Sequence, residues 1–316
     1  MLFMFLIPLL ILVVIFFVNG ESTFNLWFWS KFGSDEERYF LGKTVWVIGC
    51  SSGIGAEIVL RLAQLDCNVI LSARRKEELD TLKKRCDVCI KLNSINKIVY
   101  TIINRISIGC DKLPGHEGVL QKSKHFLRKV DVIILSCGQS QRAEWTTVDP
   151  KVDDACFLVN ALGPTVLARE YLKTLKTDEN ALQVLLPPIH FVVVSSVAGV
   201  VGAILSPSYT AAKHALMGYF RVLAFEYSGK GVDVSLVCPS LTFSPNNVLN
   251  AFTSDFNKIN GEVLSEPTTA HMSAARCAQL ILLAASNKIS ECWLSKRASI
   301  LLLCYSSMLF PGFTTK

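Results

Sequence analysis

The feature that most constrains the fold of this chain is a repeated alternation, from Gly42 onward, of short apolar runs and longer helical segments. The apolar runs are rich in β-branched residues, which favours strands, and the segments between them have the pattern of amphipathic helices. Strands that alternate with helices form a parallel sheet covered on both faces. The sequence therefore predicts an α/β fold, a Rossmann-like doubly wound parallel sheet, in one domain over residues 42–310.

The expected elements can be given by residue range. Strands are expected at residues 44–48, 68–73, 98–104, 131–135, 190–196 and 232–238. Helices are expected from a glycine-rich turn to about residue 65, from residue 76, and at residues 117–128, 152–175, 207–227 and 271–285. Sheets of this kind bind ligands beyond the carboxyl ends of their strands, which is where the motifs described below fall.

Composition excludes several classes of protein. Hydrophobic residues make up 51% of the 316 residues and charged residues only 18%, which argues against a disordered chain. The net charge of +6 is small and dispersed, so we expect no nucleic-acid partner. The 11 cysteines are irregularly spaced, which argues against a disulfide framework. The CxxC pair, Cys86 and Cys89, has no second pair of ligands, so we expect no metal site.

The first 18 residues carry no charge and are long enough to cross a bilayer as a helix. We expect residues 1–20 to be an N-terminal transmembrane anchor. A cleaved signal peptide is the alternative, because Val18 and Gly20 suit the residues before a cleavage site, although no basic region precedes the apolar run.

Two further apolar stretches leave their roles open. Trp27, Phe28 and Trp29 are expected either at the membrane headgroups or packed on the domain. Residues 300–313 are expected to contact the bilayer, to cap the substrate site or to pack in the ordinary way. Lys31 and the basic residues that follow it are mixed with acidic ones, so the side of the membrane that the domain faces stays open.

A glycine-rich turn follows the first expected strand and opens a helix. Glycines let the backbone turn tightly and approach a pyrophosphate, whose charge meets the free N–H groups at the start of the helix. In this strand–turn–helix context the turn predicts a dinucleotide site. The expected contacts in the turn are Gly49, Ser51, Ser52, Gly53, Ile54 and Gly55.

The end of the second expected strand bears on which dinucleotide binds. Enzymes that use NAD place a carboxylate there for the ribose hydroxyls. This chain has Ala73 followed by Arg74 and Arg75, and a guanidinium can hold a 2′-phosphate bidentately. We expect the cofactor to be NADP(H), bound by Arg74 and Arg75. The alternative is that the two arginines are only an exposed basic helix start.

Four polar residues form the candidate catalytic set. Tyr209 and Lys213 lie four residues apart, hence on one face of an expected helix. Ser196 ends a hydrophobic strand 13 residues before the tyrosine, and Asn160 lies on the preceding helix. A phenol is a poor acid–base group at neutral pH unless a nearby cation stabilises its phenolate, and Lys213 supplies that charge.

These motifs resemble the short-chain dehydrogenase/reductase superfamily, and within it most closely the branch of SDR family member seven. The resemblance covers nearly the whole chain beyond the anchor. The strings that carry it are GKTVWVIGCSSGIG, LSARRKEEL, GQSQR, YTAAKHAL and ECWLS.

The resemblance implies a role for each candidate. Tyr209 is implied as the acid–base, Ser196 as the group that orients the substrate oxygen, Lys213 as the support of the tyrosine and of the nicotinamide ribose, and Asn160 as the holder of a relay water. It also implies no metal, a homodimer, and a relation to members of the endoplasmic-reticulum membrane that act on steroids, retinoids and xenobiotic carbonyls. The further cofactor contacts that it implies are Asn104, Gly138, Asn160, Tyr209, Lys213 and Pro239.

The chain departs from the family pattern at four places. Ile48 stands for a threonine, Leu135 and Ser136 for two asparagines, Asn104 for an adenine-binding aspartate, and Ser240 for a glycine after Pro239. These changes concern the cofactor more than the catalytic set.

The expected function is an NADP(H)-dependent oxidoreductase that interconverts a carbonyl and an alcohol on a small lipophilic substrate. The first alternative is a catalytically weak, nucleotide-binding scaffold of the same fold. The second is a membrane interaction protein whose apolar ends bind lipid, which leaves the four polar residues unexplained.

Overall fold

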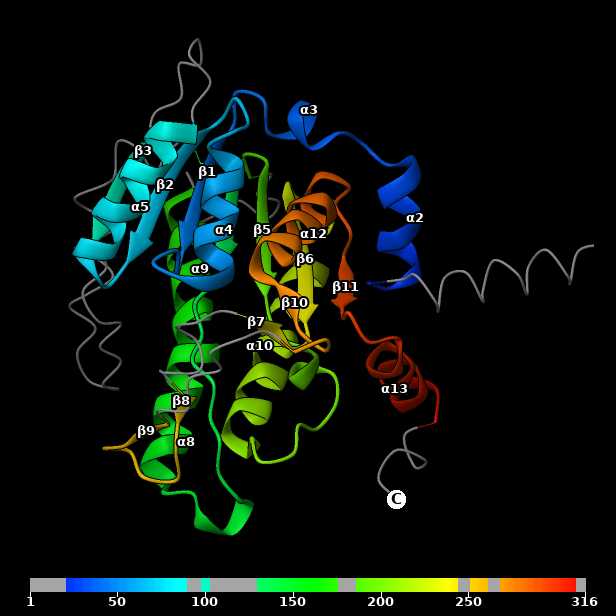
Figure 1. Ribbon diagram of the computed structural model, residues 1–316. Coiled ribbons are helices and arrows are strands. Elements are labelled where there is room, and N and C mark those ends of the chain that lie inside the picture. Colours follow the sequence, from blue (N-terminus) through cyan, green and yellow to red (C-terminus); the bar gives the residue numbers. More distant parts are fainter. Residues whose placement is uncertain are drawn as a thin grey trace, which may run out of the picture.

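The computed structural model describes residues 21–89, 98–102, 130–175, 186–243, 251–260 and 268–310. Within them, a seven-stranded parallel sheet runs in the order β11-β6-β5-β4-β1-β2-β3, as predicted for a doubly wound fold (Figure 1). Its strands are β1 (Thr44–Ile48), β2 (Asn68–Ala73), β3 (Ile98–Ile102), β4 (Val132–Leu135), β5 (Ile189–Val194), β6 (Val232–Pro239) and β11 (Glu291–Leu294). The strand order reverses between β1 and β4, which is where such sheets bind ligands.

The strands are apolar on both sides because helices cover both faces of the sheet. Val45 and Val47 of β1 point into one hydrophobic layer. Trp46 and Ile48 point into the other layer. This explains why the strands appear in the sequence as unbroken apolar runs.

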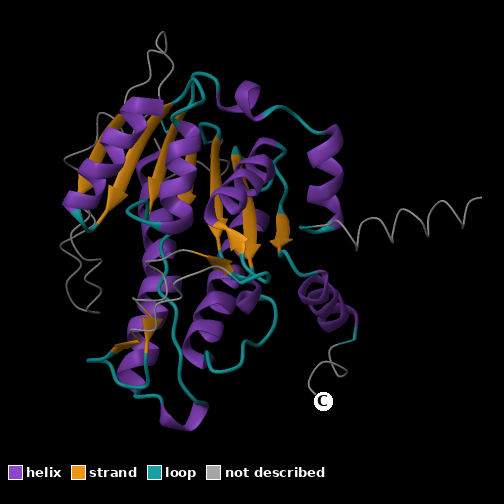
Figure 2. Cartoon of the chain, viewed as in Figure 1, coloured by secondary structure: helices purple, strands orange, loops and turns teal. Residues whose placement is uncertain are grey.

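Each face of the sheet has its own set of helices (Figure 2). One layer contains residues of α4 (Gly53–Leu62), α5 (Lys76–Cys89) and α12 (Ala274–Ser286). The other layer contains residues of α8 (Pro150–Phe157), α9 (Gly163–Leu175) and α10 (Pro207–Glu226). Both layers are closed by large buried side chains, for example Ile58 of α4 and Phe220 of α10.

The structure corrects one expected helix. The segment expected as a single helix over residues 152–175 is α8 and α9 joined by a π-helical turn, η2 (Leu158–Leu162). A π-turn widens the helix by one residue and frequently lies at functional sites, and this one carries Asn160. The helix expected at residues 117–128 lies outside the described residues.

Smaller elements complete the description. They are α2 (Phe24–Phe32), α3 (Glu36–Phe40), η1 (Trp145–Thr147), η3 (Val197–Gly199), β7 (Thr242–Phe243), β8 (Ala251–Phe252), β9 (Ile259–Asn260), β10 (Met272–Ser273) and α13 (Ala298–Leu309). No helix in the described ranges is long and apolar enough to cross a membrane. The expected anchor, residues 1–20, lies outside those ranges.

The segment that leads into α2 closes the outer edge of the sheet. Ser22 bridges Leu294 of β11 in antiparallel fashion, and the Thr23 amide donates to the Trp293 carbonyl at 3.0 Å. An exposed strand edge is prone to pair with other chains, so this segment covers part of that edge.

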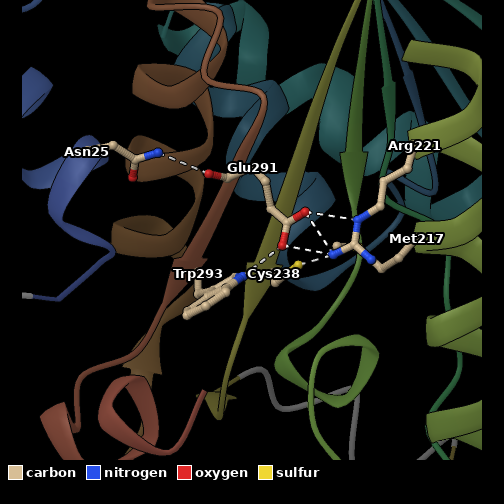
Figure 3. A network of polar contacts seen from close by, with 6 residues as sticks. All are labelled: Asn25, Met217, Arg221, Cys238, Glu291 and Trp293. Atoms are coloured by element: carbon tan, nitrogen blue, oxygen red, sulfur yellow. Dashed lines mark hydrogen bonds and ion pairs between the residues drawn. The ribbon is translucent and has the colours of Figure 1, made fainter. Parts of the chain in front are cut away.

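A polar network secures the same edge (Figure 3). The Glu291 carboxylate accepts hydrogen bonds from the Arg221 guanidinium at 2.9 Å and 3.1 Å and from the Trp293 indole at 3.1 Å. The Asn25 side chain donates to the Glu291 carbonyl at 3.1 Å. One residue of β11 thus joins α10 through its side chain to the start of α2 through its backbone carbonyl.

Candidate active site

Ser196 lies just beyond the carboxyl end of β5. The expected strand over residues 190–196 ends at Val194, so Ser196 is free to begin the short helix η3, where its Oγ accepts from the Ala198 amide at 3.2 Å. The same hydroxyl donates to the Pro239 carbonyl at 3.3 Å. The expected site residues Ser196 and Pro239, which follow or end neighbouring strands, are therefore in direct contact.

Lys213 and Tyr209 lie one turn apart on α10, as their spacing predicts. The Lys213 side chain is buried, and its Nζ donates to the Val194 carbonyl at the end of β5 at 3.2 Å. That ammonium lies 5.7 Å from the centre of the Tyr209 ring. Burial of a cation is costly unless it is hydrogen-bonded. The Val194 carbonyl therefore stabilises the buried ammonium and keeps it near the Tyr209 ring.

Asn160 braces the segment that follows β4. Its Nδ2 donates to the carbonyls of Gln139 and Cys156, both at 2.9 Å, and its Oδ1 accepts from the Gln139 amide at 3.1 Å. Both amide protons are used, and Oδ1 keeps one lone pair for a further donor such as water. The π-turn is what brings this side chain to the segment after β4.

Gly138 lies beside both Asn160 and Lys213. A Cβ atom placed on Gly138 would stand 2.9 Å from the Asn160 Oδ1 and 3.4 Å from the Lys213 Nζ. Three of the expected site residues thus meet at one point, and Gly138 is the residue type that leaves them room.

The glycine-rich turn has the backbone geometry expected of a phosphate-binding loop. Gly49 has a φ of +85°, and a Cβ on it would lie 2.6 Å from the Cys137 backbone nitrogen. Gly53 has a φ of +59° and opens α4. Only glycine adopts such conformations without strain, so the turn is built for close approach by another backbone or a ligand.

The N-terminus of α4 supports the same interpretation. Ser52 is the N-cap residue, but its side chain makes no capping hydrogen bond. The first N–H groups of a helix need partners and attract anions. A Cβ at Gly49 would lie 2.6 Å from the Cys137 nitrogen, and a Cβ at Gly55 would clash with the Gly49 carbonyl oxygen. The glycines therefore keep the turn tight, and this start of α4 fits a dinucleotide pyrophosphate.

The two arginines after β2 differ in their contacts. Arg75 donates to the hydroxyls of Ser51 and Ser52, each at 3.0 Å, so it reaches the glycine-rich turn. Arg74 is exposed and acts from a distance on Cys137, whose thiol pKa is raised by burial and lowered by the charges of Lys213 and Arg74. Both cations therefore face the region between the turn and the end of β4.

A cleft lies beside these arginines, between α4 and α5. It is lined by Ser51, Ser52, Gly53, Ala56, Glu57, Glu78, Thr81, Leu82, Arg85, Phe243 and Ala274. Glu78 lies 3.7 Å from Arg75 and would compete with a phosphate for the Arg75 guanidinium. The cleft is thus at the phosphate end of the expected cofactor site and not at Tyr209.

The departures from the family pattern are explained in part. Ile48, which stands for a threonine, is buried in the second hydrophobic layer. Backbone hydrogen bonds hold the turn in place of the missing hydroxyl. The Ser136 amide donates to the Ile48 carbonyl at 2.9 Å, and the Gly49 amide donates to the Ser72 carbonyl at 2.8 Å. The Ser240 amide donates to the Leu294 carbonyl at 2.7 Å. Asn104 lies outside the described residues.

Four buried polar groups lie outside the expected catalytic and cofactor-binding residues. The side-chain polar atoms of Gln141, Ser195, Ser208 and Ser240 are buried and, within the described residues, have no hydrogen-bond partner. An unsatisfied buried group costs about 1–3 kcal/mol. Gln141 is fully buried, and its position in the polar run after Gly138 was the available signal for it.

The chain was compared with known proteins. Residues 43–251 match the family model described as short chain dehydrogenase. The human protein "Dehydrogenase/reductase SDR family member 7" is 28% identical over 295 residues, which cover 93% of this chain and 82% of that protein. The Dictyostelium discoideum protein "Dehydrogenase/reductase SDR family protein 7-like" is 26% identical over 269 residues, 83% of this chain and 76% of its own length.

Solved structures share the fold. A short-chain dehydrogenase from Streptomyces avermitilis superposes with a TM-score of 0.65 at 21% identity and covers 87% of this chain and 96% of its own. An alcohol dehydrogenase from the archaeon Thermococcus sibiricus, complexed with 5-hydroxy-NADP, has a TM-score of 0.62 at 17% identity, with coverage of 80% and 96%.

Proposed function

Because this chain belongs to the short chain dehydrogenase family, we propose that it is an NADP(H)-dependent oxidoreductase that interconverts a carbonyl and an alcohol on a small lipophilic substrate. The observation that carries the proposal is the buried Lys213 ammonium, held by the Val194 carbonyl at 3.2 Å and lying 5.7 Å from the Tyr209 ring. A fixed cation beside a phenol is what acid–base work by a tyrosine requires.

The chain's own residues then have distinct tasks. In carbonyl reduction, Tyr209 gives its phenolic proton to the substrate oxygen, and the Ser196 hydroxyl donates a hydrogen bond to the same oxygen. Lys213 stabilises the phenolate that is left. Asn160 holds Gln139 in place and offers its remaining Oδ1 lone pair to a water that returns a proton.

The cofactor would be held by residues on three strand ends. The glycine-rich turn and the start of α4 suit the pyrophosphate, Gly138 suits the adenosine side, and Lys213 suits the nicotinamide ribose. When bound there, the nicotinamide supplies a hydride for reduction or accepts one for oxidation. The preference for NADP(H) rests on Arg74 and on Arg75, whose guanidinium lies 3.0 Å from the Ser51 and Ser52 hydroxyls.

The lipophilic nature of the substrate is supported by the loop before α10. Ile204 and Leu205 are exposed in this loop, Ile204 almost completely, at 93%. Leu205 has a φ of +58°, which is unusual for a leucine, and its carbonyl accepts from the Ala143 amide at 2.9 Å. Exposed apolar side chains in the loop that leads into the helix of Tyr209 suit a ligand such as a steroid, a retinoid or a xenobiotic carbonyl.

The proposal extends to where the protein works. Residues 1–20 anchor it in a membrane, since the first 18 of them are uncharged and long enough to cross a bilayer. We propose the endoplasmic reticulum on the resemblance to SDR family member seven alone.

The protein is proposed to be a homodimer, as many proteins of its family are. The surface of α10 is available for this, because Tyr219, Val222 and Phe225 form an exposed apolar line at a spacing of three residues. Light scattering of the detergent-solubilised protein should give the mass of two chains, and Phe225→Glu should give that of one.

Two measurements on purified protein test the catalytic proposal. Binding of NADPH should shift its fluorescence, and steroids, retinaldehyde and aromatic dicarbonyls should then be screened for substrate-dependent consumption of NADPH. Consumption with at least one lipophilic carbonyl is expected. Binding without consumption of NADPH by any of them would favour the nucleotide-binding scaffold.

A further inference from the structure

Two helices from opposite ends of the chain, α2 and α13, lie on the same side of the molecule (Figure 1). The Phe24 amide at the start of α2 donates to the Tyr305 hydroxyl of α13 at 3.2 Å. The Tyr305 ring in turn lies 4.9 Å from the ring of Trp293 in β11. The two helices therefore flank the edge strand and form one continuous surface.

Each helix packs on the domain through only a few residues. Leu26 of α2 and Leu301 and Cys304 of α13 are buried. Trp27, Ile300 and Tyr305 are partly exposed. Most of the other large apolar side chains are exposed, with Phe32 70% exposed and Leu309 71% exposed. We call this surface the α2–α13 face; its exposed apolar residues are Phe24, Phe28, Trp29, Phe32, Leu302, Leu303, Met308, Leu309 and Phe310.

An apolar surface of this kind needs a partner. Contiguous exposed apolar patches mark sites that bind proteins or membranes, and these side chains are not used to hold the helices on the domain. The charges around the face favour a membrane. Within α13 there is no charged residue, α2 carries only Lys31, and the exposed Lys296 and Arg297 directly precede α13.

Tryptophan at the level of the headgroups, with lysine and arginine beside it, is the arrangement found at membrane interfaces. Basic residues near the surface are attracted by anionic lipids. The acidic residues that flank α2 are Glu21 before it and Asp35, Glu36 and Glu37 beyond Gly33, and none lies within the helix. Glu21 is paired with Arg276 at 2.8 Å, and Glu36 is paired with Arg61 at 2.9 Å.

The place where the N-terminal segment joins the domain indicates that a bilayer covers the α2–α13 face. Residues 1–18 carry no charge. Glu21, three residues further on, accepts a hydrogen bond through its carbonyl from the Ser295 amide at 2.9 Å. Ser295 lies three residues before α13, and Glu21 lies three residues before α2. An anchor in these residues would therefore bring the bilayer to the gap between the two helices.

We propose that the α2–α13 face lies in the headgroup region of the bilayer that holds the N-terminal anchor, and that it orients the domain on the membrane. The inference rests on the anchor of the proposed function and gives it a consequence for the substrate. Helix α13 follows the carboxyl end of β11, and Ser196 and Tyr209 lie at the same end of the parallel strands. The active site is thereby turned toward the lipid phase from which a lipophilic substrate comes.

The tryptophans of the chain provide a direct test. Residues 1–20 contain none, and the chain has Trp27, Trp29, Trp46, Trp145 and Trp293. The full-length protein is reconstituted in vesicles of phosphatidylcholine and phosphatidylserine, with and without bromine on the acyl chains, and tryptophan emission is compared. Bromine quenches only tryptophans that lie at the bilayer.

Matched variants assign the quenching to the face. Trp29→Phe should lower the fraction of emission that bromine quenches. Trp145→Phe should not lower it, because Trp145 is 79% exposed in η1, directly before α8, which lies away from α2 and α13 in Figure 1. In the Trp29→Phe background, Leu309→Trp on α13 should restore quenching, and Val222→Trp on α10 should not.

The outcomes separate this inference from the functions on which it rests. If alkaline carbonate extracts the full-length chain from vesicles, the anchor and the face both fail. If the chain resists extraction but neither Trp29 nor the tryptophan introduced at residue 309 is quenched, the anchor stands and the face is overturned, being covered by a second copy or by residues 1–18. NADPH-dependent carbonyl reduction, measured on the same vesicles, reports separately on catalysis.

Discussion

Gly138 lies so close to Asn160 that a Cβ atom on the glycine would stand 2.9 Å from the asparagine Oδ1. Such a contact is shorter than van der Waals distance, so Gly138→Ala must displace Asn160 or the Lys213 ammonium, 3.4 Å from the same point. We expect kcat/KM for carbonyl reduction to fall by about 10²-fold, as for small misplacements of catalytic groups.

The control for this substitution is Gly218→Ala. Gly218 lies within α10, and a Cβ on it would meet nothing within 4 Å. Alanine there should leave the kinetics unchanged and raise stability by about 0.5–1 kcal/mol through helix propensity. Equal kinetics for both variants would show that Asn160 and Lys213 tolerate displacement.

A second prediction concerns the choice of cofactor. If Arg74 and Arg75 bind a 2′-phosphate by charge-assisted hydrogen bonds of about 1.5–3 kcal/mol each, Arg74→Ala and Arg75→Ala should weaken NADPH about ten- to a hundredfold. NADH should be nearly unaffected, and Ala73→Asp should reverse the preference. The measurement is the ratio of kcat/KM for NADPH over NADH, with Lys84→Ala, an exposed cation further along α5, as the control.

The assignment would be contradicted if wild-type protein already prefers NADH, or if neither arginine variant changes the ratio. Arg74 and Arg75 would then be only the exposed basic start of a helix. Glu78, which lies 3.7 Å from Arg75, gives a further check. Glu78→Gln should strengthen NADPH binding, since it removes a negative charge from the phosphate end of the cleft.

Much of the fold could be predicted from the sequence because both layers of the sheet leave a clear pattern. Strands β1 and β2 have the expected bounds, Thr44–Ile48 and Asn68–Ala73, since burial on both faces makes them unbroken apolar runs. The edge strand β11, with the sequence ECWL, lacks this pattern, since it begins with a charged residue and has no β-branched residue. The π-turn at Leu158–Leu162 leaves no signal either, because its residues continue the helical spacing.

The parts of the site that depend on the spacing of residues within one helix were predictable, whereas the contacts between distant segments were not. Tyr209 and Lys213 had to share a helix face, but which group holds the ammonium, the Val194 carbonyl, depends on where β5 ends. The contacts of Arg75 with Ser51 and Ser52 likewise come from the meeting of two strand ends. The unpartnered Gln141 amide is a property of packing, which the sequence does not encode locally.

A third prediction is a loss of stability in mild acid. His190 is buried between Tyr39, whose hydroxyl lies 2.7 Å from Nδ1, and Ser235, whose Oγ lies 2.9 Å from Nε2. Burial is the main cause that lowers the pKa of His190 from 6.5 to about 4; the charge of Asp233 opposes this shift, and the charges of Lys288 and Lys43 support it. The unfolded chain therefore binds a proton between these values and the folded protein does not.

Because the unfolded state takes up the proton, the free energy of unfolding should fall as pH decreases from about 6.5 to about 4. The total loss from this group is on the order of 3 kcal/mol. Urea unfolding measured across this range should show the slope in wild type and a flatter one in His190→Gln. His214→Gln, on the exposed side of α10, should keep the wild-type slope; a His190→Gln profile parallel to wild type would contradict the assignment.

A fourth prediction concerns the N-terminal segment. Deleting residues 1–20 removes the uncharged run and should shift the protein from the carbonate-resistant membrane pellet to the soluble fraction. The full-length chain should stay in the pellet with its N-terminus intact. Soluble protein that lacks these residues after expression of the full chain would identify them as a cleaved signal peptide.

The most direct test of the account is Tyr209→Phe, which keeps the ring and its packing and removes only the transferable proton. Wild type and variant are compared for kcat/KM in carbonyl reduction, and NADPH binding is measured by fluorescence on the same samples. We predict that turnover falls by about 10²–10⁴-fold, as for loss of a general acid, while NADPH still binds. Turnover retained in Tyr209→Phe would contradict the assignment of Tyr209 as the acid–base and, with it, the proposed mechanism.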